Sequence, residues 1–265
     1  MSAAGPHLLV LAGCIAAYLA VAFLSVIMGR RNLWLVYPAL IIIAAAASLA
    51  DLSALLTMAS GALRLPLGLP SIGLNLGLDG LSAFFGLIVN LGVLTAAIYG
   101  LGLDREHDLS RRIEPFIPAF AAAMNMVLLA GDAFFFLFSW EFMSLTSWAL
   151  VCARPNDPDS RKAGYVYLVM AAIGTAALLF AFGGLAGVAG GYAFDTMRQA
   201  VPTPLVSTLV LIAVLVGAGS KAGIVPLHAW LPLAHPAAPS HVSALMSGVM
   251  TKVAIYGLIC VVFDL

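Results

Sequence analysis

The sequence predicts an all-α protein, a polytopic transmembrane helical bundle of about eight helices. Of its 265 residues, 63% are hydrophobic and only 9% are charged, whereas a soluble globular domain carries about 25% charged residues. The apolar residues occur in runs of roughly 20, the length of a helix that crosses the hydrocarbon core. The formal net charge is zero, which gives no support for nucleic-acid binding.

We predict eight spans, counted from the apolar runs. The first run ends in Arg30 and Arg31; a cleaved signal peptide would carry its positive charge before the run, so we interpret it as a retained helix. The predicted spans are 7–28, 33–57, 80–102, 114–130, 132–152, 163–189, 204–224 and 240–263.

Two connecting segments and one glycine-rich stretch complete this organisation. Residues 64–79 are rich in Gly and Pro and too short to span, which predicts a surface loop or a short hairpin. Residues 193–203 form a short polar connector. The stretch 182–191 contains glycines at the small-xxx-small spacing of close helix contacts, Gly183/Gly187 and Gly187/Gly191.

Basic residues gather in alternate loops, which predicts the orientation. Eight lie in the loops after spans one, three and five: Arg30, Arg31, Arg105, Arg111, Arg112, Arg154, Arg161 and Lys162. The opposite loops offer only Arg64 and Arg198. Because cytoplasmic loops of inner-membrane proteins carry the excess of Lys and Arg, we expect both the N-terminus and the end of span eight outside a cell membrane.

Three charged residues fall well inside apolar runs: Glu141, Lys221 and Lys252. A charge at the centre of a membrane helix costs about 2.5–3.5 kcal/mol on insertion scales, and such residues usually face a bundle interior or a water-filled path. A Glu that merely bonds neighbouring helices, and a lysine that snorkels near a span end, are the structural alternatives.

Lys221 precedes a predicted break in span seven. Glycines surround it, and Pro226 follows five residues later. Proline cannot donate to the helix ladder and clashes with the carbonyl four residues back, here that of Ala222. We therefore predict a helix broken just after the lysine, as in segments that line a cavity or are buried in protein.

Histidines accompany two of these charged residues. His241 lies eleven residues before Lys252, almost three helical turns, so both should share a face with Leu245 and Gly248, about 16 Å apart along the axis. A hydrated relay and a helix-start residue are open alternatives for His241. His228 and His235 flank Trp230 near the inner face, and no third convergent ligand points to a metal.

These residues suggest a proton-transfer hypothesis. Burial favours the neutral form of a lysine, and a nearby carboxylate favours the charged form. If Glu141 and Lys221 meet, closing the pair loads the lysine with a proton, and opening the pair releases the proton toward Lys252. The hypothesis predicts proton translocation that depends on both residues.

Three stretches resemble a known family: FSWEFMSL, GSKAGIVPLHAWLPLAHPAAPSHVSALMSG and TKVAIYGL. They are similar to the antiporter-like subunits of respiratory complex I and of Mrp cation/proton antiporters, and most of all to the large membrane subunit of hydrogenase-4 and formate hydrogenlyase. The resemblance is sharpest over residues 110–265.

The resemblance implies a fold of about fourteen helices with two inverted five-helix repeats. Residues 1–110 would then form helices one to three with a short outer loop or hairpin, and residues 111–265 the first repeat with a proton half-channel. Glu141 would take the place of the family's glutamate in helix five, Lys221 that of the lysine in broken helix seven, and Lys252 that of the residue in helix eight. His228 and His235 match positions near the inner face. The second repeat and its exit residue are not in this sequence, so either the chain is a fragment of a longer gene product or the second half is a separate polypeptide. We expect no complete proton path in this chain alone.

Three functions stay open at this point. The first is a proton-conducting subunit of a membrane-bound hydrogenase or a complex I-like oxidoreductase, with redox chemistry in partner subunits. The second is an Mrp-type cation/proton antiporter subunit, and the third a membrane scaffold without transport of its own. The sequence has no cysteine cluster for iron–sulfur, no phosphate-cradling glycine loop and no haem ligand pair, so we expect no cofactor. The partners would be lipid, protons, other membrane subunits and, through these, a soluble hydrogenase or electron-transfer arm.

Overall fold

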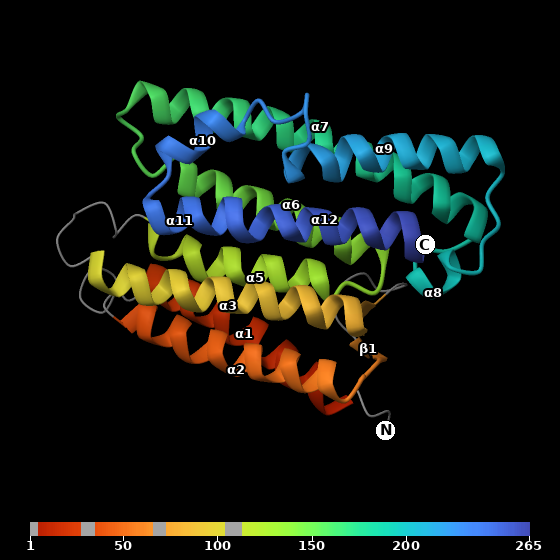
Figure 1. Ribbon diagram of the computed structural model, residues 1–265, viewed down its shortest axis with the longest axis horizontal. Coiled ribbons are helices and arrows are strands. Elements are labelled where there is room, and N and C mark those ends of the chain that lie inside the picture. Colours follow the sequence, from red (N-terminus) through yellow and green to blue (C-terminus); the bar gives the residue numbers. More distant parts are fainter. Residues whose placement is uncertain (1–4, 28–34, 66–72, 104–112) are drawn as a thin grey trace.

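In the computed structural model, which describes residues 5–27, 35–65, 73–103 and 113–265, long helices lie side by side (Figure 1). The first group comprises α1 (Gly5–Ile27), α2 (Val36–Leu56), α3 (Gly80–Leu103) and α5 (Phe116–Leu128). The second comprises α6 (Ala133–Val151), α7 (Pro158–Ala189), the short α8 (Phe194–Met197) and α9 (Pro204–Ala222). After α10 (Leu231–Ala237), a last continuous segment joins α11 (Ser240–Leu245), the π-helical turn η3 (Met246–Met250), α12 (Thr251–Ile259) and the π-helical turn η4 (Cys260–Asp264).

The predicted all-α membrane bundle is confirmed, with one difference in the spans. Within the described ranges, seven helical segments are long and apolar enough to cross a membrane, and α5 is shorter, with 13 residues. It is about 20 Å long, against about 30 Å for the hydrocarbon core. Every residue from Ile117 to Leu128 is buried, so neighbouring helices surround α5, and its length need not match the lipid. The start of α1 and the end of η4 lie at the same end of the bundle (Figure 1), as an even number of crossings would require.

The segment predicted as a loop or short hairpin is a hairpin. Strands β1 (Gly61–Leu65) and β2 (Leu74–Leu78) pair antiparallel, with Gly61 opposite Leu78. The hairpin is joined to the link between α5 and α6: the Gly77 amide donates to the Leu129 carbonyl at 2.9 Å, and the Gly131 amide donates to the Asn75 carbonyl at 2.8 Å. The link 66–72 and the basic positions Arg30, Arg31, Arg105, Arg111 and Arg112 lie outside the described residues.

Local signals in the sequence explain where the second group of helices begins and ends. The Asp132 side chain caps α6 by accepting from the Phe135 amide at 2.7 Å, and Thr203 caps α9 ahead of Pro204. Such caps satisfy amides that the first helical turn leaves without a partner. Gly190 ends α7 with a φ of 72°, a left-handed conformation that glycine adopts without strain.

The glycines of α7 that we expected to pack against a neighbouring helix are not the ones that do so in this chain. A Cβ added at Gly183 or Gly187 would meet no atom within 4 Å, so neither glycine mediates a close helix contact. The close approach of α7 and α9 occurs instead at Gly174 and Gly217, where a Cβ on Gly217 would lie 2.8 Å from the Gly174 carbonyl oxygen. The small-residue pattern identified the right helix, but it did not indicate which face packs, because that depends on the partner helix.

Candidate functional site

The break in the helix of Lys221 lies where the sequence predicts it. Helix α9 ends at Ala222, and Gly223 follows with a φ of 79°. The chain then makes an irregular turn as far as Trp230, whose indole Nε1 donates to the Ser220 carbonyl at 2.7 Å. The same carbonyl accepts from the Gly223 amide at 3.3 Å, so the indole is a second donor to a carbonyl of the last helical turn. The break thus lies partway along the bundle, and α10 continues from it toward the end opposite the chain termini (Figure 1).

The Lys221 ammonium lies among neutral oxygen atoms and aromatic rings. Its side chain is 4% exposed, and Nζ donates to the Ser144 hydroxyl of α6 at 2.5 Å and to the Tyr167 hydroxyl of α7 at 3.3 Å. The same Nζ lies 5.6 Å from the centroid of the Trp140 ring and 5.5 Å from that of the Tyr167 ring. Cation–π contacts of this kind strengthen when the cation is removed from water.

Tyr167 connects the lysine to the rest of the site. Its hydroxyl lies 2.5 Å from the Ser147 hydroxyl and 3.7 Å from the Met250 sulfur, and its ring meets the Trp230 ring edge-on at 5.1 Å. One side chain thereby contacts α6, η3 and the irregular segment after α9. The position of Tyr167 therefore depends on every element that surrounds the break.

Glu141 lies near Lys221 but does not form an ion pair with it. The Glu141 carboxylate is half-buried and accepts a hydrogen bond from the Thr175 hydroxyl of α7. It still interacts electrostatically with Lys221. Ser144 follows Glu141 by one turn on the same face of α6, about 4.5 Å along the axis. The ammonium therefore binds the hydroxyl one turn beyond the carboxylate.

His241 and Lys252 are separated by a feature that the sequence did not predict. The turn η3 (Met246–Met250) between them is π-helical and has more residues per turn than an α-helix. His241 is buried, with Nε2 3.2 Å from the Tyr37 hydroxyl. Lys252 Nζ donates backward to the Ser247 carbonyl and the Thr251 hydroxyl, each at 3.3 Å.

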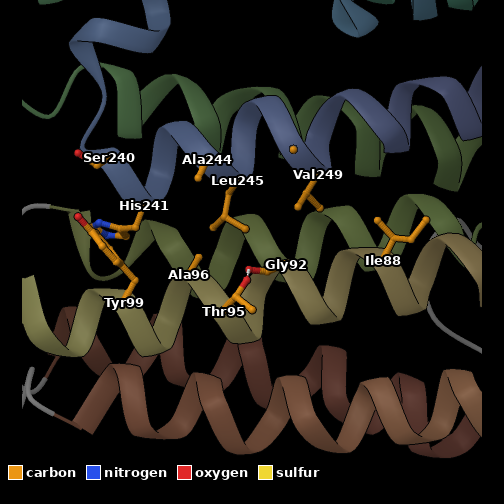
Figure 2. Close-up of a pocket in the computed structure, with 11 residues that line it drawn as sticks. Ile88, Gly92, Thr95, Ala96, Tyr99, Ser240, His241, Ala244, Leu245 and Val249 are labelled. Atoms are coloured by element: carbon orange, nitrogen blue, oxygen red, sulfur yellow. Dashed lines mark hydrogen bonds between the residues drawn. The ribbon is translucent and has the colours of Figure 1, made fainter.

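A groove between α3 and the α11–η3 segment follows the face of His241. It has a volume of about 460 Å³ and is lined by Tyr99, Leu245, Gly248 and Val249, among others. Figure 2 shows His241 of α11 beside Tyr99 of α3 at one end of this groove. The lining does not include Lys252, so the face expected to be shared holds as far as Gly248 and does not reach the lysine.

His228 and His235 occupy different surroundings near the same end of the bundle. His228 is exposed, whereas His235 is half-buried, with Nδ1 2.8 Å from the Ser243 hydroxyl. Burial lowers the pKa of the His235 ring below its ordinary value. Neither histidine contacts Lys221 directly in the described structure.

Sequence reasoning missed several polar residues because they carry no charge or lie near a predicted span end. Tyr167, Ser147 and Thr175 are ordinary polar residues of membrane helices. Packing places Tyr167 at Lys221, Ser147 at Tyr167 and Thr175 at Glu141. Asp51 lies near the end of predicted span 33–57, yet it is 2% exposed and belongs with the deep ionisable groups. The number of charged residues well inside the bundle is therefore larger than the three predicted.

Comparisons with known proteins agree with this geometry. Residues 130–265 match the family model described as NADH:quinone oxidoreductase/Mrp antiporter, transmembrane. Hydrogenase-4 component B of Escherichia coli is 41% identical over 194 residues, which cover 72% of this chain and 29% of that protein. The chain thus spans less than a third of this curated relative.

Two solved structures share the fold. A chain of the archaeal membrane-bound sulfane sulfur reductase superposes with a TM-score of 0.81 at 20% identity, covering 97% of this chain and 54% of that one. A chain of the Mrp complex from Dietzia sp. superposes with a TM-score of 0.76 at 22% identity, covering 95% of this chain and 28% of that one. With the broken helix, the buried lysine and the match over residues 130–265, the chain belongs to the NADH:quinone oxidoreductase/Mrp antiporter transmembrane family.

Proposed function

We propose that this chain conducts protons as a membrane subunit of an oxidoreductase complex of the hydrogenase or complex I type, whose redox chemistry takes place in partner subunits. The observation that carries the proposal is the Lys221 ammonium, buried at a helix break with neutral hydroxyl partners and one turn away from the Glu141 carboxylate. A buried charge without a paired countercharge is costly. Such an arrangement is suited to a group that gains and loses a proton.

The proposed mechanism uses two positions of the lysine. When Nζ moves about one turn along α6, from Ser144 to Glu141, the carboxylate stabilises the protonated amine. When Nζ returns to Ser144 and Tyr167, only neutral oxygens and aromatic rings surround it, and the proton can pass on. Gly223 and the irregular segment after α9 allow this movement, because the last turn of α9 is not continued by a helix.

The path of the proton beyond Lys221 is part of the proposal. Tyr167 leads toward η3, and Lys252 follows that turn in the sequence. On the other side, α10 with His228 and His235 leads to the end of the bundle that carries the loop between α6 and α7 (Figure 1). That loop region contains Arg154, Arg161 and Lys162, so we propose that this end faces the cytoplasm and that the N-terminus is outside.

The names of the relatives supply the partners of the proposal. One relative is named as component B of hydrogenase-4, and the two solved structures are named as an archaeal respiratory membrane complex and as the Mrp complex. We therefore propose that this chain also works beside other membrane subunits. The half-channel would lie in residues 111–265, and a path across the whole membrane would include parts contributed from outside this chain.

The test measures proton transfer in membrane vesicles that contain the whole complex. We expect Glu141→Gln and Lys221→Met each to abolish formation of a pH gradient, followed with a fluorescent pH probe, while the complex still copurifies. Lys162→Met is the control, because this exposed lysine lies at the start of α7. Unchanged proton transfer in Glu141→Gln would contradict the proposal, and unchanged transfer in Lys221→Met with failed assembly on deletion of the chain would favour a scaffold. A rate that depends on Na⁺ would favour an antiporter.

A further inference from the structure

A second buried polar cluster lies in the first group of helices, away from Lys221. It consists of Tyr18 of α1, Asp51 of α2, Asn90 of α3 and Asn125 of α5, and all four side chains are buried. Asn90 is its centre: Nδ2 lies 2.9 Å from Asp51 Oδ2 and 2.9 Å from Asn125 Oδ1, and Oδ1 accepts from Asn125 Nδ2 at 3.2 Å and from the Tyr18 hydroxyl at 3.3 Å. Four helices thus converge on one amide.

The cluster has too few hydrogen atoms for its acceptors. Asn90 Nδ2 carries two hydrogens but lies within hydrogen-bond distance of three oxygens, those of Asp51, Asn125 and the Gly86 carbonyl at 3.0 Å. The three acceptors therefore share two hydrogens, and no oxygen among them, including that of Asp51, has a hydrogen of this amide to itself unless the other two share the second. The shared amide is the hydrogen-bond donor that the structure gives the Asp51 carboxyl group.

Asp132 shows what a buried carboxylate looks like when it is well supplied with donors. It is 0% exposed and accepts from three N–H groups: the Phe135 amide at 2.7 Å, the Asn75 amide at 3.2 Å and the Asn75 side chain at 3.1 Å. Asp51 has one shared neutral donor, and no ion pair with it occurs in the described ranges. A buried carboxylate anion with so little support is strongly disfavoured.

The surroundings of Asp51 leave room for a proton and little else. A Cβ on Gly86 would lie 2.7–2.9 Å from the atoms of the Asp51 carboxyl group, so the backbone of α3 covers it. The oxygens of Asn90 and Asn125 already face N–H or O–H donors, which disfavours a metal cation needing several free oxygens. One turn earlier on α2, the buried Ser48 hydroxyl has no hydrogen-bond partner among the residues that the structure describes. The titratable groups of α1 that interact electrostatically with Asp51 are the Cys14 thiol and the Tyr18 phenol; α3 and α5 present amides.

We propose that Asp51 is a second intramembrane proton-binding site, separate from Lys221, at which the carboxylate takes up one proton and is held as a neutral acid beside the amide of Asn90, which Asn125 positions. The proton comes from hydronium: an O–H bond of hydronium breaks, an O–H bond forms on the Asp51 carboxyl group, and water is left. The site does not depend on the Lys221 mechanism, because it is built from α1, α2, α3 and α5 and shares no side chain with that mechanism.

Infrared difference spectroscopy tests this site, because a protonated carboxylic acid has a carbonyl band that a carboxylate lacks. Using the purified full chain in lipid nanodiscs at neutral pH, we expect the spectrum of wild type minus Asp51→Asn to contain one acid band. Asp51→Asn keeps the size of the side chain and replaces the acid with a neutral amide. The same subtraction with Asp159→Asn, an exposed position, should contain no acid band.

The outcomes are distinct. An acid band lost in Asp51→Asn and insensitive to exchange of K⁺ for Na⁺ supports the proposal. Absence of the band overturns it, since Asp51 would then be ionised. A band present in K⁺ and lost in Na⁺ also overturns it in favour of a metal cation. If Asp51→Asn does not fold, ¹³C-labelled aspartate in wild type and in Asp51→Glu gives the same decision: a shifted acid band that is lost in Asp51→Glu supports the site, and a band kept in Asp51→Glu or absent from both proteins refutes it. Loss of proton transfer in Lys221→Met bears only on the other site.

Discussion

The two polar regions of this bundle each bury an ionisable side chain, but they surround it with different chemical groups. Around Lys221, a cation is surrounded by hydroxyl groups and aromatic rings at the end of a broken helix. Around Asp51, an acid is surrounded by amides between helices that continue past it. The first region adjoins the irregular segment after α9, whereas the second is closed by the backbone of α3 at Gly86. The comparison suggests a mobile proton carrier in one region and a fixed proton-binding group in the other.

The largest expected effect comes from the glycines that allow close packing in each region. In Gly217→Ala, the new Cβ would lie 2.8 Å from the Gly174 carbonyl oxygen and 2.6 Å from Leu178 Cγ. Because a backbone atom cannot move without displacing α7, we expect a loss of about 1–3 kcal/mol in the free energy of unfolding. In Gly86→Ala the obstacle is the Asp51 side chain, which can rotate, so the loss should be smaller.

Thermal unfolding in detergent measures both losses against Gly183→Ala, where the added Cβ meets no atom within 4 Å. That control should be neutral or slightly stabilising, since alanine favours helix more than glycine does. A larger loss in Gly86→Ala than in Gly217→Ala would show that the Asp51 region is the more rigid of the two.

A second prediction compares single hydroxyl groups. Ser144→Ala removes a hydrogen bond to a charged ammonium, worth about 1.5–3 kcal/mol, whereas Tyr18→Phe removes a neutral one, worth about 0.5–1.5 kcal/mol. At about 1.4 kcal/mol per factor of ten, we expect Ser144→Ala to slow proton transfer in vesicles roughly tenfold. Tyr18→Phe should leave the rate unchanged while lowering thermal stability slightly. If both variants slow transfer equally, the two regions belong to one path.

The sequence alone predicted one of these regions far better than the other. Lys221 and Pro226 can be recognised in the sequence, because a lysine and a proline inside an apolar run each cost free energy in a membrane helix. Their presence therefore predicts a special environment. The glycines and prolines of residues 64–79 likewise predicted a loop or a short hairpin there. Asp51 was overlooked because a carboxyl group near a span end can reach water at the membrane surface at little cost in free energy. Only the packing of α1, α3 and α5 shows that this carboxyl group is buried.

The neutral polar residues of the two regions could be predicted even less well from the sequence. Nothing distinguishes Asn90 or Tyr167 from other polar residues in membrane helices until their partners, 35 and 54 positions away, are known. The π-helical turn η3 was also unpredictable, since the i, i+3, i+4 pattern of apolar residues continues through it. Contacts distant in sequence, and local changes in helix geometry, are therefore what the structure adds.

The smallest expected effect concerns His235, at the end of the Lys221 region that leads out of the bundle. Burial lowers the pKa of His235, so its folded-state pKa lies below the unfolded value. The stability contributed by the neutral ring is therefore present above the ordinary pKa of about 6.5 and is lost as the pH falls through the lower, folded-state pKa. We expect wild type to lose slightly more thermal stability than His235→Gln between pH 7 and pH 5.

Ser243→Ala separates this desolvation effect from the hydrogen bond. The Ser243 hydroxyl lies 2.8 Å from His235 Nδ1, and its removal should leave the direction of the pH dependence unchanged, because burial is the cause of the shift. NMR titration of the His235 ring gives the direct measurement. An ordinary or raised pKa would mean that water reaches α10 freely, and the Lys221 region would then be open as far as this histidine. A lowered pKa would mean that water from this end of the bundle does not freely reach His235. A proton entering from this end would then pass a partly dehydrated imidazole before it reaches Lys221.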